Sequence, residues 1–162
     1  MVDKIKKVLD RTILSVASFL LIILVIGALW QVFSRYVLST PSTFTNELLG
    51  FLLVWTSLLG ASYAFGSNQH LAITFFRDKF KGKRKQIITM INDLFILFFA
   101  IIVLIDGGMD AVSTAMTQTT PILGITTGYV YLIVPITGAI IVLYKLLEVR
   151  KYFNKQENEG DL

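Results

Sequence analysis

Residues 12–33, TILSVASFLLIILVIGALWQVF, contain no charged side chain over a length that can cross a membrane. An α-helix rises about 1.5 Å per residue, so about 20 apolar residues cross a hydrocarbon layer roughly 30 Å thick. This stretch predicts a transmembrane helix over about residues 12–34. The basic segment before it is typical of a secretory signal, but the run is longer than a signal core and no small-x-small cleavage site follows. We therefore expect an uncleaved first span.

Three more stretches have the length and composition of transmembrane helices. They cover about residues 44–66, 87–106 and 127–147, and Asn92 and Asp93 interrupt the apolar run of the third. Hydrophobic residues make up 54% of the 162-residue chain, as is typical of membrane proteins. The predicted fold is an all-α integral membrane protein with one four-span domain over residues 1–162, ending in a polar tail at 148–162.

The basic residues indicate the orientation of the chain. All but one of the 15 lysines and arginines lie before the first span, between the second and third, or near the end of the fourth. The connections at about 36–43 and 106–126 carry none, so the positive-inside rule places both termini in the cytoplasm. The exception is Arg35. This distribution explains the net charge of +4 without nucleic acid as a partner.

The segment between the second and third spans, LAITFFRDKFKGKRK at residues 71–85, mixes phenylalanines with basic residues. Such a composition suits an amphipathic helix lying on anionic lipid, and a solvated basic loop explains it equally well. In the first case the lipid contacts are Arg77, Lys79, Lys81, Lys83, Arg84 and Lys85.

The residue inventory argues against catalysis and against a bound cofactor. The chain has no cysteine and a single histidine, His70, so a disulfide framework, thiol chemistry and a bis-histidine haem within one chain are excluded. No nucleophile–base set and no glycine-rich phosphate loop can be assembled. We expect neither an enzyme nor a cofactor protein.

Asp93 is the deepest ionisable residue of the predicted spans. Charged groups inside a membrane are costly, so they are functional candidates by default. A proton or sodium carrier would use such a carboxylate, but a buried ion pair with Arg11 or Lys145 is the interpretation we favour.

Small residues and prolines mark further features of the spans and their connections. The second span has Ser57/Ala61, Gly60/Ala64 and Ser62/Gly66 at the spacing of helix packing seams, and the partner helix can belong to this chain or to another protein.

Pro135 predicts a kink in the fourth span, because it frees the carbonyl of Tyr131. The uncharged connection around Pro121 is a candidate docking surface.

The stretch RYVLSTPSTFTNELL, residues 35–49, holds two charges on either side of a proline turn. Arg35 ends the first span and Glu47 begins the second, so each charge complements the dipole of its helix. An antiparallel hairpin brings the two to similar depth, which predicts an Arg35–Glu47 ion pair that clasps the hairpin.

Several longer stretches resemble the small membrane subunit of tripartite ATP-independent periplasmic (TRAP) transporters, the DctQ-like family. They are QVFSRY at 31–36, TNELLGFLLVWTSLLGASYAF at 45–65, QHLAI at 69–73 and PILGITTGYVYLIVP at 121–135. No single motif is diagnostic, but their order and spacing are specific. The family often has an acidic residue before the histidine of the third stretch, where this chain has Gln69.

The resemblance implies a scaffold in the bacterial inner membrane. It implies a large polytopic permease as partner, carrying the substrate and sodium sites, and a periplasmic substrate-binding protein. Imported organic acids, including sialic acids or dicarboxylates, are implied as substrates. Arg35, Glu47, Trp55, Gly60 and His70 match the family pattern and would serve the hairpin and subunit contacts.

Two other functions remain open from the residues alone. One is a self-sufficient four-helix exporter that works as a dimer, with a membrane carboxylate as proton carrier. The other is a purely structural assembly factor. The first requires an acid well inside a span, and the second requires that transport itself not depend on the chain.

Overall fold

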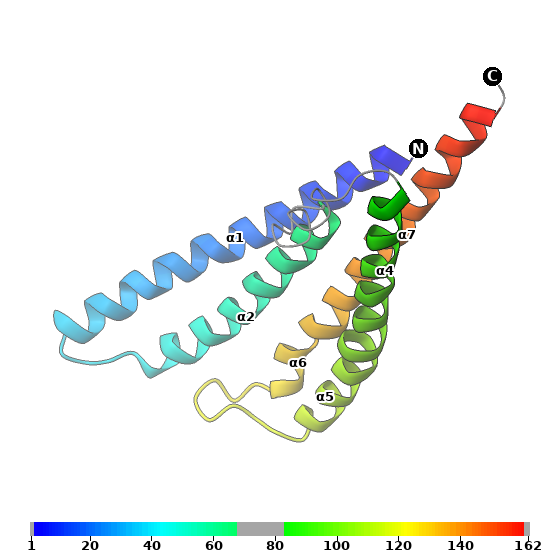
Figure 1. The fold of residues 1–162 in the computed structure, drawn as a ribbon. Coiled ribbons are helices and arrows are strands. Elements are labelled where there is room, and N and C mark those ends of the chain that lie inside the picture. Colours follow the sequence, from blue (N-terminus) through cyan, green and yellow to red (C-terminus); the bar gives the residue numbers. More distant parts are fainter. Residues whose placement is uncertain (1, 68–82, 161–162) are drawn as a thin grey trace.

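The computed structural model describes residues 2–67 and 83–160, and its named elements in these ranges are all helices (Figure 1). Four helical stretches are long and apolar enough to cross a membrane. They confirm the predicted all-α membrane protein with four spans. In chain order the elements are α1 (Val2–Tyr36), α2 (Thr43–Gly66), α4 (Lys83–Phe98), the π-helix η1 (Phe99–Asp106), α5 (Gly107–Ala115), α6 (Thr127–Tyr131) and α7 (Ile133–Gly160).

The spans form two helical pairs that lie close at one end and diverge toward the other (Figure 1). The first pair is α1 with α2, and the second is the continuous third span (α4, η1, α5) with the last span (α6, α7). We call the end with the start of α1, the end of α2 and the start of α4 the terminal end. The end with the connections at 37–42 and 116–126 is called the loop end.

Local hydrogen bonds define the turn between α1 and α2. Ser39 adopts a left-handed backbone conformation with φ of 56°, which reverses the chain after Tyr36. Ser42 then caps α2, because its hydroxyl accepts a hydrogen bond from the amide of Thr45 at 3.4 Å. The two helices approach closely at Gly27, where an added Cβ would lie 2.9 Å from Leu49 Cδ2.

The third span is longer than the sequence predicted. We expected it to end near residue 106, but the helical run continues from Ile87 to Ala115. Packing explains the extension, since an added Cβ at Gly108 would lie 3.1 Å from Pro135 Cδ, and Val112 and Ala115 are buried. The carboxylates of Asp106 and Asp110 therefore belong to a span and not to a connection.

The third span changes its helical winding in its middle. Residues 99–106 form a π-helix with i→i+5 hydrogen bonds, a rare conformation that is frequent at functional sites. This segment packs on α7, where an added Cβ at Gly138 would lie 2.8 Å from Leu104 Cβ and 3.0 Å from the Ala100 carbonyl oxygen. Any larger residue than glycine at 138 would force the two helices apart.

The last span is interrupted at Leu132, between α6 and α7. The interruption lies just before the buried Pro135, whose ring has no N–H to donate and clashes with the carbonyl four residues earlier. The helix then continues to Gly160, through the segment predicted as a polar tail. Ile133 and Tyr144 of α7 form the core with Ile13 and Leu59, so α7 carries much of the internal packing.

Candidate functional site

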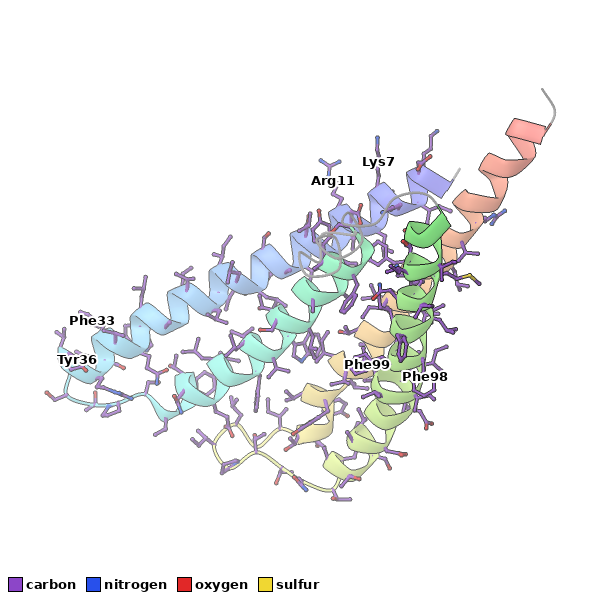
Figure 2. All side chains as sticks on the ribbon, viewed as in Figure 1. Lys7, Arg11, Phe33, Tyr36, Phe98 and Phe99 are labelled. Carbon is purple, nitrogen blue, oxygen red and sulfur yellow. The ribbon has the colours of Figure 1, made fainter. Side chains whose placement is uncertain are left out.

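The terminal end contains a buried charge cluster. Lys145 of α7 is only 3% exposed, and its Nζ lies 2.7 Å from Asp93 Oδ1 and 2.9 Å from Glu148 Oε2. Asp93 thus pairs with one of the two cations that we considered. The other, Arg11, points away from the bundle (Figure 2). The contact ties the third span to the fourth.

A second polar contact at the same end joins the first span to the fourth. The hydroxyl of Tyr144 donates a hydrogen bond to Asp10 Oδ1 at 2.6 Å. The tyrosine ring fills the space beside Gly66, where an added Cβ would lie 2.5 Å from three ring carbons. Adjacent residues of α7, Tyr144 and Lys145, therefore contact all three other spans.

At the loop end the predicted Arg35–Glu47 clasp is wrong. The carboxylate of Glu47 accepts a hydrogen bond from the backbone amide of Leu123 at 2.7 Å. Thr45 and Leu49 face α1 near Gly27, and a residue two positions from either is rotated about 200° around a helix with 3.6 residues per turn. Glu47 therefore faces away from α1, toward the 116–126 connection.

Neutral side chains join the first hairpin instead. The amide nitrogen of Gln31 donates to Asn46 Oδ1 at 2.9 Å. Arg35 is exposed, and among the residues that the structure describes its guanidinium forms no ion pair. Arg35 lies in the last turn of α1. The exposed Phe33 and Tyr36 belong to the same turn (Figure 2).

Trp55 links the two helical pairs in the interior of the spans. Its indole Nε1 donates to the carbonyl oxygen of Val130 at 3.0 Å. Val130 lies in α6, two residues before the interruption at Leu132. The tryptophan that matched the family pattern thus forms a contact within this chain.

The small residues of α2 divide between two faces. Ser62 and Gly66 are buried, and Gly66 lies against Tyr144 of α7. Gly60 is exposed, and an added Cβ there would meet nothing within 4 Å. One part of the predicted seam therefore packs inside this chain, whereas Gly60 faces outward.

Large apolar faces of the spans are left uncovered by the chain itself. On α1, Phe19, Ile22, Ile26 and Leu29 are each more than half exposed and recur at helical spacing. The third span also exposes Phe98 and Phe99 (Figure 2). Lipid or a partner protein must cover these faces.

The predicted lipid-contacting segment falls mostly outside the described residues. His70, Arg77, Lys79 and Lys81 belong to the part that is not described, as does the possible interfacial helix. Lys83, Arg84 and Lys85 form the first turn of α4 by their backbone. The lipid contact stays a prediction.

Residues 23–154 match the family model of the DctQ component of tripartite ATP-independent periplasmic transporters. This match starts within α1 and ends within α7, so it includes all or part of each span. The chain belongs to the DctQ family. It is accordingly a transmembrane component of transport systems, as its resemblance to that family implied.

Two curated relatives of the chain are named as small permease proteins of TRAP transporters. A TRAP transporter small permease protein of Haemophilus influenzae is 26% identical over 140 residues, covering 86% of this chain and 82% of the relative. The sialic acid TRAP transporter small permease protein SiaQ of Vibrio cholerae is 27% identical over 125 residues, covering 77% of this chain and 70% of the relative. Both similarities extend over most of each protein.

Sequence reasoning missed several polar residues of the spans. Asp10, Tyr144 and Glu148 take part in the contacts of the terminal end, and an acidic residue within the basic N-terminal segment was a usable signal for Asp10. Asp106 and Asp110 were assigned to a connection because the predicted third span ended near residue 106. Only the packing of Gly108 on Pro135 shows that the helix continues.

Proposed function

We propose that this DctQ-family chain is the small scaffold subunit of a TRAP-type importer. In this proposal it binds a large polytopic permease in the bacterial inner membrane, while a periplasmic substrate-binding protein delivers the substrate. The observation that carries the proposal is the family match over residues 23–154. The chain's own role is structural, and the large subunit transports the substrate.

The internal contacts of the chain support a scaffold. At the terminal end, Lys145 of the last span pairs with Asp93 of the third span, and Tyr144 donates a hydrogen bond to Asp10 of the first. Groups bonded in this way hold helices in fixed positions. The wide apolar faces of α1 and the third span offer surface to a large membrane partner.

The proposed orientation places the terminal end on the cytoplasmic side. The basic residues at the start of α1 and those of the first turn of α4, Lys83 to Lys85, adjoin this end, as the positive-inside rule requires. The 37–42 and 116–126 connections then face the periplasm, where the binding protein is expected.

The proposed transport reaction is sodium-driven import of an organic acid. The Vibrio cholerae relative is named for sialic acid, so sialic acid is the first substrate to test and dicarboxylates are the second.

The test begins with the tagged chain purified in mild detergent from its native membrane. We expect a large polytopic permease in near-equal amount. This complex, reconstituted in liposomes with the binding protein, should accumulate labelled sialic acid or a dicarboxylate only when sodium is higher outside. Liposomes holding the large subunit without this chain are the control, and we expect them to show little uptake.

Two outcomes would contradict the proposal. Recovery of this chain alone as a dimer, with substrate-dependent proton release, would instead support a self-sufficient exporter. Equal uptake by the large subunit alone would reduce the chain to an assembly factor.

A further inference from the structure

Two exposed carboxylates lie within the third span. Asp106 ends η1 and Asp110 follows one turn later in α5, so the two share one face of the helix. Both are exposed, and within residues 2–67 and 83–160 neither side chain forms an ion pair or hydrogen bond. They differ in this from Asp93, which the chain pairs internally.

The packing of the span fixes the depth of Asp106. Gly108 lies against Pro135 and Val134 of the last span, about 10 Å from the start of that span at Thr127 at 1.5 Å per residue. From the other side, about 20 Å of helix separates Asp106 from the Asp93–Lys145 pair. Asp106 therefore lies within the apolar layer, and Asp110 about 6 Å nearer to the loop end.

The surroundings of Asp106 on the helix surface are apolar. In a π-helix the neighbours on one face lie four and five positions apart, so Asp106 adjoins Ile102 and Ile101. Met109 follows Asp106 three positions later, and all three apolar side chains are about half exposed. Gly107, next to Asp106, carries no side chain and leaves room for another helix to approach closely. In lipid, this face would place a carboxylate against acyl chains with no bonding partner, which is costly. Aspartate is also too short to extend to the interface as lysine does.

We propose that the face formed by Asp106, Asp110, Ile101, Ile102 and Met109 binds a transmembrane helix of the large permease subunit through a lysine or arginine of that helix. This inference rests on the proposed function. A cation on the partner would neutralise the carboxylates, and the apolar neighbours would exclude water from the contact.

Other occupants fit this face less well. Lipid phosphates are anionic and lie at the interface, not at the depth of Asp106. A soluble binding protein does not reach into the apolar layer. A second copy of the chain offers Lys145 inside its spans, but Lys145 is 3% exposed and already pairs with Asp93 and Glu148. Its exposed Arg35 lies in the last turn of α1, not at the depth of Asp106.

The experiment uses the complex of the full chain with its co-expressed large subunit. A photoreactive phenylalanine analogue is placed at Ile102, at Met109 and, for comparison, at Leu94 on the exposed face of α4. We expect cross-links to the large subunit from positions 102 and 109. In parallel, the double variants Asp106→Asn with Asp110→Asn and Asp106→Glu with Asp110→Glu are compared for the amount of large subunit they retain.

The asparagine pair should lower recovery of the large subunit by about tenfold, because the partner cation loses its counter-charge. The glutamate pair keeps both charges and should stay within about twofold. Each variant chain is also expressed alone. Equal yield and melting temperature there would show that any loss comes from the contact and not from the fold.

Different failures have different meanings. If the wild-type complex forms but positions 102 and 109 give no cross-link and the asparagine pair retains the large subunit, the contact is wrong while the proposed function stands. If the asparagine pair leaves the complex intact but abolishes uptake, the carboxylates act in ion transport and the contact is also wrong. If the wild-type chain recovers no large subunit, the proposed function fails and the contact fails with it.

Discussion

The two ends of the bundle are held together in different ways. At the terminal end, Lys145 and Tyr144 connect the last span to carboxylates of the first and third, and the tyrosine ring fits against Gly66 of the second. At the loop end, the two helical pairs diverge (Figure 1), and Glu47 contacts the 116–126 connection through a single backbone amide.

This difference indicates at which end the helices keep their relative positions and at which end they can shift. Buried ion pairs lose much when one partner is removed, whereas a half-exposed hydrogen bond contributes less. We therefore expect the terminal end to keep the four spans together, and the loop end to adjust to a partner. The following substitutions test this contrast, from the largest expected effect to the smallest.

The substitution Lys145→Met should destabilise the chain most. It leaves Asp93 and Glu148 as neighbouring carboxylates without their cation, at a cost of about 3–5 kcal/mol. The free energy of unfolding is measured by titrating the purified chain in detergent with dodecyl sulfate. The double variant Lys145→Met with Asp93→Leu should recover part of the loss. If the single variant is as stable as the wild type, the charge cluster does not hold the terminal end together, and the proposed difference between the two ends is wrong.

The substitution Gly66→Leu should have the next largest effect. Its side chain would collide with the ring of Tyr144, and overpacking of this kind costs about 1–3 kcal/mol. The matched control is Gly60→Leu on the same helix, where an added Cβ has open space and the change should stay within about 0.5 kcal/mol. Equal losses at the two glycines would show that α2 does not pack on α7 through Gly66.

The substitution Glu47→Ala should act locally. Loss of the bond to Leu123 should cost about 1 kcal/mol and speed hydrogen exchange at the Leu123 amide several-fold, with little change at the terminal end. Glu47→Gln keeps an acceptor oxygen and should lie between the wild type and the alanine variant. If exchange speeds up equally at both ends, the loop end is part of one cooperative unit with the terminal end.

The substitution Arg35→Ala should change the isolated chain least, by less than about 0.5 kcal/mol, because the side chain is exposed. The same unfolding titration measures it. If Arg35→Ala lowers the free energy of unfolding as much as Glu47→Ala, Arg35 forms a second stabilising contact at the loop end. A normal isolated chain combined with a weakened complex would place Arg35 in a contact with another subunit.

Sequence patterns were sufficient wherever length and hydropathy decide the structure. The stretches around 12–33 and 44–66 could only be long apolar helices, and the rule that charges inside membranes pair led to Lys145 as a candidate for Asp93. The partner of Glu47 was out of reach, because Leu123 lies in a connection whose shape depends on tertiary contacts. The end of the third span was missed for a similar reason, since helix propensity argues against Gly107 and Gly108.

The π-helix at residues 99–106 also has a rotational consequence. Each of its turns contains about one more residue than an α-helical turn. The π-helix therefore determines the directions in which the side chains of α5 point around the helix axis. Deleting one residue would turn α5 by about 100°, carrying Gly108 away from Pro135 and bringing a bulkier neighbour into its place. The number of residues between Asp93 and Gly108 thus determines the rotation of α5 about its own axis. At the present length, Gly108 faces the last span, while Asp106 and Asp110 face outward.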